Sequence, residues 1–161
     1  MTGMIIRLNR RHTNLLADID FESEHQLDRE RDSTKAEMQK SIIMRFKRGH
    51  ELWFGYKEGG MLLGYATIKP FFPGHKHCEL YWLAVRKSHQ GKGIGSRLLR
   101  YVEDAARAKG FRRVCLYTGK VMKATRLFYE KNGYRLINEF PRFYGFNLGD
   151  TTSLLYAKDL R

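Results

Sequence analysis

The chain has 161 residues, 42% of them hydrophobic and 13% aromatic, which excludes a disordered chain and predicts a single domain over residues 1–161. Thirty lysines and arginines against seventeen aspartates and glutamates give a formal net charge of +13, so the surface should attract anions: nucleic acid, a phosphate-bearing cofactor or an acidic protein. No apolar run approaches the roughly 18 residues of a membrane span, and none is typical of a signal peptide. We therefore expect a cytoplasmic protein without a membrane partner.

The predicted elements alternate between strands and helices. In chain order we expect a strand at 4–10, helices at 12–26 and 33–48, a hairpin at 51–69, a strand at 78–85, a helix at 94–108, a strand at 113–118, a helix at 123–131, and strands near 134–140 and 152–158. Ser33 is the expected N-cap of the second helix, with Glu37 near its first turn. This order predicts an α/β (α+β) fold, because a central strand–turn–helix–strand unit puts two strands parallel.

The two cysteines, Cys78 and Cys115, both lie in apolar runs typical of strands. We expect buried, reduced thiols, since free cysteine behaves as a small apolar residue. A disulfide and a catalytic thiol are the alternatives.

A glycine-rich turn, Gln90-Gly91-Lys92-Gly93-Ile94-Gly95, joins the strand at 78–85 to the helix at 94–108. Glycines let backbone N–H groups approach a ligand closely, and a helix N-terminus adds the positive end of its dipole. Lys87 and Lys92 add full positive charges. The turn is therefore a predicted pyrophosphate site, although its glycine spacing differs from that of the Walker loop and of the Rossmann fingerprint.

Two segments resemble the signatures of the GNAT superfamily of N-acetyltransferases. The first is the glutamine of this turn, followed by x-x-Gly-x-Gly, after a strand that ends Leu83-Ala84-Val85. The second is Arg126-Leu127-Phe128-Tyr129-Glu130-Lys131-Asn132-Gly133-Tyr134, at the expected distance downstream. The resemblance covers nearly the whole chain, and it implies the GNAT fold: a mixed sheet of about seven strands, splayed at its middle, with four helices.

The resemblance also implies acetyl-CoA as cosubstrate and no metal. In the superfamily, backbone groups at the end of the splayed strand bind the pantetheine arm, and N–H groups of the glycine turn hold the pyrophosphate. The residues expected to bind the cofactor are Leu83, Ala84, Val85, Gln90, Gly91, Lys92, Gly93, Ile94, Gly95 and Ser96.

Two catalytic roles follow from the same resemblance. Tyr129 matches the tyrosine that many members use as general acid, because the departing CoA thiolate needs a proton or a strong donor. Glu79, at the start of the splayed strand, matches a glutamate that deprotonates the amine in several members, often through water. His75 and His77 are alternative bases, because histidine as a residue type titrates closer to neutrality than glutamate. The other interpretation is that both are surface histidines of the loop after Pro73.

One position departs from the superfamily. Many members carry an asparagine near the start of the second-signature helix, where it touches the pantetheine arm, and the corresponding residue here is Met122. This change should weaken or reroute that contact. It also supports an alternative function, a non-catalytic acyl-CoA-binding GNAT module, while the charge of +13 suggests a second alternative, a basic RNA- or ribosome-associated protein.

The predicted reaction moves the acetyl group of acetyl-CoA to a primary amine by direct attack in a ternary complex. The amine belongs to a small molecule or to a protein or peptide, and the candidate walls of its site are Phe21–Asp32 and Phe140–Gly145, with Asp150-Thr151-Thr152 beyond. A homodimer through the late strands is expected by analogy only. No sequence signature of nucleic-acid binding is present.

Overall fold

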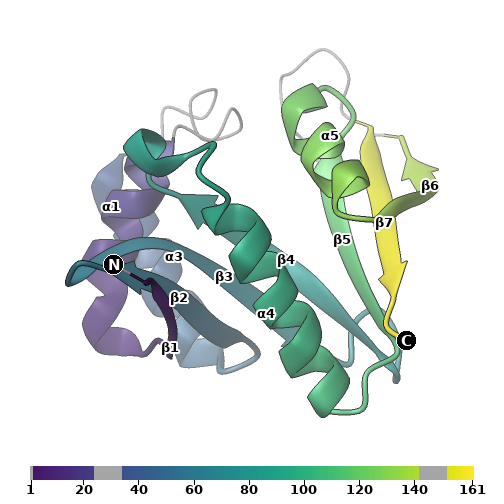
Figure 1. Ribbon diagram of the computed structural model, residues 1–161, viewed down its shortest axis with the longest axis horizontal. Coiled ribbons are helices and arrows are strands. Elements are labelled where there is room, and N and C mark those ends of the chain that lie inside the picture. Colours follow the sequence, from purple (N-terminus) through teal and green to yellow (C-terminus); the bar gives the residue numbers. More distant parts are fainter. Residues whose placement is uncertain (1, 24–33, 142–151) are drawn as a thin grey trace.

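Seven strands form one mixed sheet in the computed structural model, which describes residues 2–23, 34–141 and 152–161 (Figure 1). The strands are β1 (Met4–Arg7), β2 (Leu52–Glu58), β3 (Met61–Pro70), β4 (His77–Val85), β5 (Arg113–Gly119), β6 (Arg135–Phe140) and β7 (Ser153–Asp159). Their order in the sheet is β1-β2-β3-β4-β5-β7-β6, and only the β4–β5 pair is parallel among these strands. This confirms the predicted mixed α/β fold and its central parallel unit.

Four helices cover the two faces of this sheet in the described part of the chain (Figure 1). They are α1 (Thr13–Ser23), α3 (Lys35–Arg48), α4 (Ile94–Ala108) and α5 (Lys123–Lys131). The bounds of the last two agree with the helices predicted at 94–108 and 123–131. No helix of the described residues is long and apolar enough to cross a membrane.

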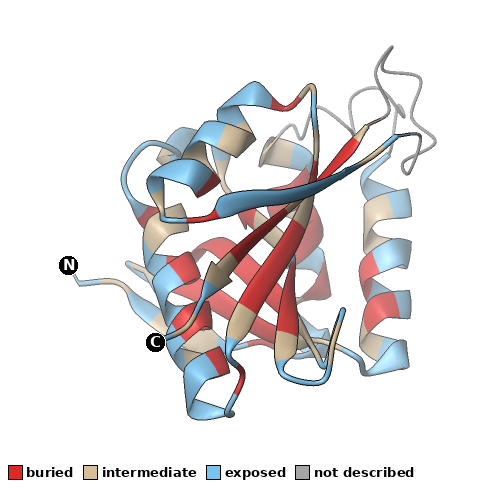
Figure 2. Ribbon diagram, turned by 90° about the vertical axis from the view of Figure 1, so that its right-hand side faces the viewer, coloured by how far each residue is buried: buried red, intermediate tan, exposed pale blue. Residues whose placement is uncertain are grey.

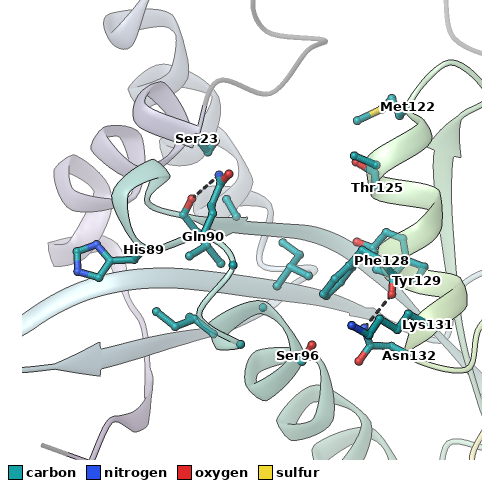
Figure 3. A pocket seen from close by; sticks show the side chains of 18 of the residues that line it. Ser23, His89, Gln90, Ser96, Met122, Thr125, Phe128, Tyr129, Lys131 and Asn132 are labelled. Carbon is teal, nitrogen blue, oxygen red and sulfur yellow. Dashed lines mark hydrogen bonds between the residues drawn. The ribbon is translucent and has the colours of Figure 1, made fainter.

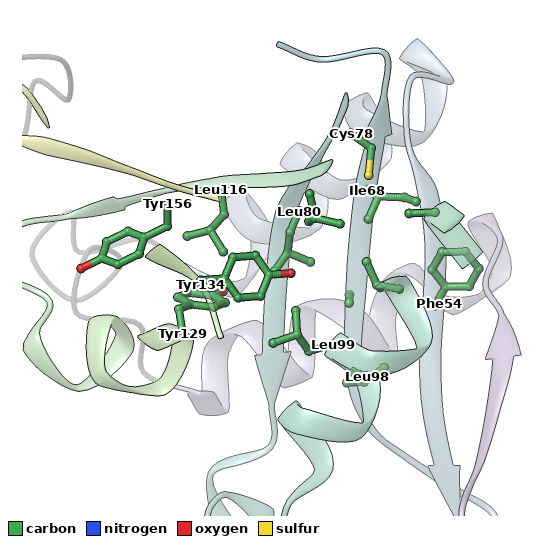
Figure 4. Close-up of a cluster of buried hydrophobic side chains, with 14 of the residues drawn as sticks. Phe54, Ile68, Cys78, Leu80, Leu98, Leu99, Leu116, Tyr129, Tyr134 and Tyr156 are labelled. Carbon is green, nitrogen blue, oxygen red and sulfur yellow. The ribbon is translucent and has the colours of Figure 1, made fainter. Parts of the chain in front are cut away.

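Two apolar cores lie on opposite faces of the sheet, and buried residues follow its central strands (Figure 2). The larger core packs α4 and α5 against the sheet, with Leu98, Leu99 and Tyr129 among its members (Figure 4). The smaller core packs α1 and α3 on the other face, through residues such as Leu16 and Ile42. The helical spacing of apolar residues predicted this burial, since one stripe of α4 faces inward.

Two predicted boundaries are wrong for local reasons. The first strand ends at Arg7 rather than at residue 10, because Asn9 caps a short 3-10 helix with its side chain. The N-cap of α3 is Thr34 and not Ser33, which lies outside the described residues. Thr34 and Glu37 form a reciprocal capping box, with the Thr34 N–H donating to the glutamate at 2.7 Å.

Both cysteines are free and buried, as predicted. Burial raises the pKa of the Cys78 thiol to about 12 and that of the Cys115 thiol to about 11. Because the nucleophilic form of cysteine is the thiolate, these pKa values argue against a catalytic thiol.

Candidate active site between the splayed strands

The parallel strands β4 and β5 pair over a short stretch and then diverge. The register joins His77–Glu79 of β4 to Arg113–Cys115 of β5, and beyond it β4 has no strand partner on this edge among the described residues. Figure 1 shows the two strands meeting near the C-terminus and opening away from it. A cavity of about 780 Å³ lies in the opening, between the start of α4 and the inner side of α5.

A β-bulge sets the direction of the diverging strand. Thr67 of β3 pairs with Trp82 of β4, but the next residue, Ile68, pairs with Leu80, so Tyr81 is the extra residue. A bulge bends its strand and exchanges the faces to which later side chains point. Leu80 and Leu83 therefore contact the core beneath α4, whereas Trp82 between them contacts the core beneath α1 and α3.

The glycine turn provides unused hydrogen-bond donors at the mouth of the cavity (Figure 3). Gly91 and Gly93 have φ angles of +75° and +80°, and a Cβ added to either would contact no protein atom within 4 Å. Gly93 is the N-cap of α4 and has no side-chain capping bond. Among the described residues, no acceptor is found for the backbone N–H groups from Gly91 to Ser96. These donors and the helix dipole fit a pyrophosphate group.

Gln90 has a different role from its neighbours in the turn. Its backbone N–H donates to the carbonyl of Lys87 at 3.3 Å, and its side chain donates to the carbonyl of Val85 at 3.1 Å. Gln90 therefore holds the turn against the end of β4. Lys92 is exposed and does not line the cavity, while the other nine residues expected to bind the cofactor do.

Tyr129 lines the same cavity from α5, opposite the glycine turn (Figure 3). Its ring contacts Phe128 and Tyr134 edge-on, with centroid distances of 5.2 and 5.7 Å. Burial raises the pKa of the Tyr129 hydroxyl, so it stays protonated at neutral pH. Within the described residues the hydroxyl has no hydrogen-bond partner, which leaves it available to a bound ligand.

Glu79 lies at the point where β4 and β5 separate, and its side chain does not line the cavity. Because its neighbours Cys78 and Leu80 point into the core beneath α4, Glu79 points to the opposite face. Only 6% of the residue is exposed, and its carboxyl group accepts no hydrogen bond from a described residue. Burial raises its pKa to about 7, against the opposing effect of Lys69 and with a smaller contribution from Glu51.

The alternative bases lie at the closed end of the strand pair. His77 begins β4 and pairs with Arg113, two residues from Glu79 and away from the cavity. His75 is exposed and stacks on Phe71, with a centroid distance of 6.0 Å. Neither histidine lines the cavity, and neither does Glu79, so the cavity lining does not single out one of the three as the base.

Some cavity residues were not among those predicted to bind the cofactor. Met122 lines the cavity as the N-cap of α5, and it accepts a weak hydrogen bond from Thr118 at 3.7 Å to its sulfur. Phe128 covers the glycine turn, since a Cβ on Gly95 would lie 3.3 Å from its ring. Most of both predicted acceptor walls, residues 24–32 and 142–145, lies outside the described residues, as do Asp150 and Thr151.

The chain belongs to the acetyltransferase (GNAT) family, which it matches over residues 14–134. It is 30% identical over 111 residues to the Xenopus tropicalis protein named probable N-acetyltransferase 14. The aligned region covers 68% of this chain and 50% of that protein. The chain thus spans about half the length of this curated relative.

Solved structures share the fold over almost the whole chain. A GNAT-family acetyltransferase from Desulfovibrio desulfuricans superposes with a TM-score of 0.80 and 25% identity, covering 99% of this chain and 100% of that one. The PaiA N-acetyltransferase of Thermoplasma acidophilum, solved in complex with coenzyme A, superposes with a TM-score of 0.72 and 20% identity, covering 99% of both chains. The family and the predicted fold are therefore confirmed.

Proposed function

We propose that this protein is an N-acetyltransferase that moves the acetyl group of acetyl-CoA to a primary amine by direct attack in a ternary complex. The observation that carries the proposal is one cavity that brings together the unpaired N–H groups of the glycine turn and the unbonded hydroxyl of Tyr129. A phosphate-binding end and a proton donor on opposite walls match what transfer from a CoA thioester requires. Membership of the GNAT family supports the same reaction.

The cofactor would bind along the splay of the strands. Gly91 to Ser96 hold the pyrophosphate, and the unpaired edge of β4 at Leu83 to Val85 binds the peptide-like pantetheine arm. When bound, acetyl-CoA supplies an electrophilic thioester carbonyl. Backbone N–H groups on this β4 edge would stabilise the negative charge that develops on the carbonyl oxygen during attack.

Two side chains then handle the protons. Glu79 accepts the proton that the ammonium must lose before it can attack, and its pKa of about 7 suits a base that works near neutral pH. We expect the transfer to run through water, because Glu79 does not line the cavity. Tyr129 donates to the departing thiolate, since its raised pKa keeps the phenol protonated until that charge appears.

The acceptor is a primary amine of a small molecule or of a protein or peptide. Glu79 lies on the sheet face opposite α4, next to Lys69 and near Tyr117, so the amine would approach from that side. A carboxylate beside the Tyr117 ring favours a cationic group, which an amine is before it loses its proton.

The experiment that tests this function measures thiol release from acetyl-CoA by the purified protein, with spermidine, free lysine and short peptides with free N-termini as amines. The expected result is thiol release that depends on an amine. When both substrates are varied, the lines of the double-reciprocal plot should intersect. Tight CoA binding without turnover of any amine would favour a non-catalytic acyl-CoA-binding module, the alternative that Met122 in the cavity wall supports.

A further inference from the structure

A buried cluster of polar groups lies beside the cavity and has no role in the reaction outlined above. Tyr134 donates its hydroxyl proton to Glu103 at 3.1 Å, and Lys158 donates to the other oxygen of the same carboxylate at 2.8 Å. Glu103 is 5% exposed and Tyr134 is 2% exposed. Groups buried so deeply cost stability unless they are paired, so each bond here matters for the local structure.

The cluster joins the two helices on which the reaction depends. Glu103 lies on α4, the helix that begins at the glycine turn. Lys158 of β7 also donates to the carbonyl of Asn132 at the C-terminus of α5, at 3.0 Å. The backbone N–H of Tyr134 donates to the carbonyl of Tyr129, also at 3.0 Å. Glu103 thus links the cofactor helix to the end of the helix that carries Tyr129.

Tyr129 depends on its neighbours for its position. Its hydroxyl makes no hydrogen bond to a described residue, and its ring packs edge-on against Tyr134, as Figure 4 shows. The Tyr134 ring is fixed in turn by its bond to Glu103. Burial, together with the charge of Glu103 and this hydrogen bond, raises the pKa of Tyr134, so its phenol remains a donor at every working pH.

The strand pairing alone holds the two sides of the cavity together over only a short length. Direct pairing of β4 with β5 covers His77–Glu79 and ends there. The Glu103 bonds reinforce this short pairing on the α4 side of the sheet, because Lys158 pairs with Val114, which in turn pairs with Cys78. A link between α4 and the end of α5 at this place helps to set the distance between the phosphate-binding turn and the phenol.

We propose that Glu103, Tyr134 and Lys158 are positioning residues that hold the phenol of Tyr129 at a fixed distance from the cofactor helix. The inference rests on the proposed function, in which Tyr129 is the proton donor. None of the three side chains touches the reacting atoms, and each acts through Tyr129. Their contribution should therefore vanish when the phenol of Tyr129 is absent.

The test is a double-mutant cycle of Tyr134→Phe and Tyr129→Phe, with kcat and the KM for acetyl-CoA read from thiol release. The acceptor in this test is the tested amine that gives the highest rate. Where no amine reacts, the CoA released by hydrolysis of acetyl-CoA is measured instead. Tyr134→Phe keeps the ring and removes one hydrogen bond, so kcat should fall about fivefold while KM stays within about twofold. In the Tyr129→Phe background, the same change should lower kcat less than about 1.5-fold.

Tyr156→Phe is the matched control. Tyr156 is also buried, and its hydroxyl donates to Glu130 at 2.7 Å, but that bond joins β7 to α5 on one side of the cavity. We expect Tyr156→Phe to leave kcat unchanged. A loss as large as that of Tyr134→Phe would assign the effect to general packing and overturn the proposal.

The remaining outcomes separate the inference from the proposed function. Equal effects of Tyr134→Phe in both backgrounds would overturn the positioning role. If Tyr129→Phe alone keeps the wild-type kcat, Tyr129 is not the proton donor. This single variant is measured before the double variant, so the two failures are distinguished. If Tyr134→Phe does not fold, as judged by its unfolding midpoint in urea, Glu103→Gln takes its place in the same cycle with the same expected result.

Discussion

Glu79→Gln should make the protein more stable at alkaline pH and less active there. Glu79 is buried, lacks a hydrogen-bond partner in the described part of the chain, and has a pKa of about 7 against an ordinary value of 4.5. The folded state therefore binds more protons than the unfolded state between these two values, and its stability falls as the pH rises through this window. Glutamine has the same shape without the charge.

The magnitude follows from the two pKa values. A carboxyl group whose pKa rises from 4.5 to about 7 destabilises the folded protein by on the order of 3 kcal/mol once it is ionised in both states. At about pH 5 the folded protein holds Glu79 protonated, so Glu79→Gln should change the free energy of unfolding by less than about 1 kcal/mol. At about pH 8.5 the variant should be more stable by up to about 3 kcal/mol.

The assay is urea unfolding at both pH values, followed by circular dichroism, with Glu139→Gln as control. Glu139 is an exposed carboxylate on β6 opposite Lys120, so its variant should show no stabilisation of this size. If Glu79→Gln changes the free energy of unfolding equally at both pH values, Glu79 does not have a raised pKa in the folded state. The kcat/KM of the wild type should rise with pH, with an inflection near pH 7, and then reach a plateau. The Glu79→Gln variant should lose this inflection and most of the activity.

Three further predictions concern the cavity and the thiols. Gly93 has a φ of +80° at the mouth of the cavity, a conformation that strains any residue with a Cβ, so Gly93→Ala should raise the KM for acetyl-CoA about tenfold. Gly60 has a similar φ of +83° in the distant β2–β3 turn, so Gly60→Ala should lose similar stability and leave this KM unchanged. Met122→Asn should lower that KM about threefold, by adding a polar contact for the pantetheine arm, and an unchanged KM would exclude this contact. Cys78 and Cys115 should resist iodoacetamide at about pH 8 until urea unfolds the protein, and rapid labelling of either in the folded state would contradict their burial.

The parts of the fold that the sequence predicted well depend on local signals. Helices α4 and α5 follow from apolar spacing and from a C-terminal glycine, Gly133, which has a φ of +89°. The cap of α3 was misassigned by one residue because Ser33 and Thr34 are both good N-caps, and only Thr34 is three residues before Glu37.

The geometry of the site was harder to predict than the helices, because it depends on contacts between segments far apart in the sequence. The bulge at Tyr81 directs the end of β4, yet no local pattern marks an extra residue in one strand. Glu79 is buried where β4 pairs with β3 and with the distant β5, and the bond between Glu103 and Lys158 joins residues 55 positions apart. The motif identified the residues of the glycine turn, but only the structure showed that Gln90 bonds within the turn while its neighbours keep their donors unpaired.

The most direct test of the account is mass spectrometry of the amine after incubation with acetyl-CoA and the purified protein, together with the amount of CoA released. The account predicts one acetyl group on the amine for each CoA released, with a rate that Tyr129→Phe lowers strongly while CoA affinity stays near that of the wild type. CoA binding in this cavity without any acetylated amine, or an unchanged rate in the Tyr129→Phe variant, would contradict it.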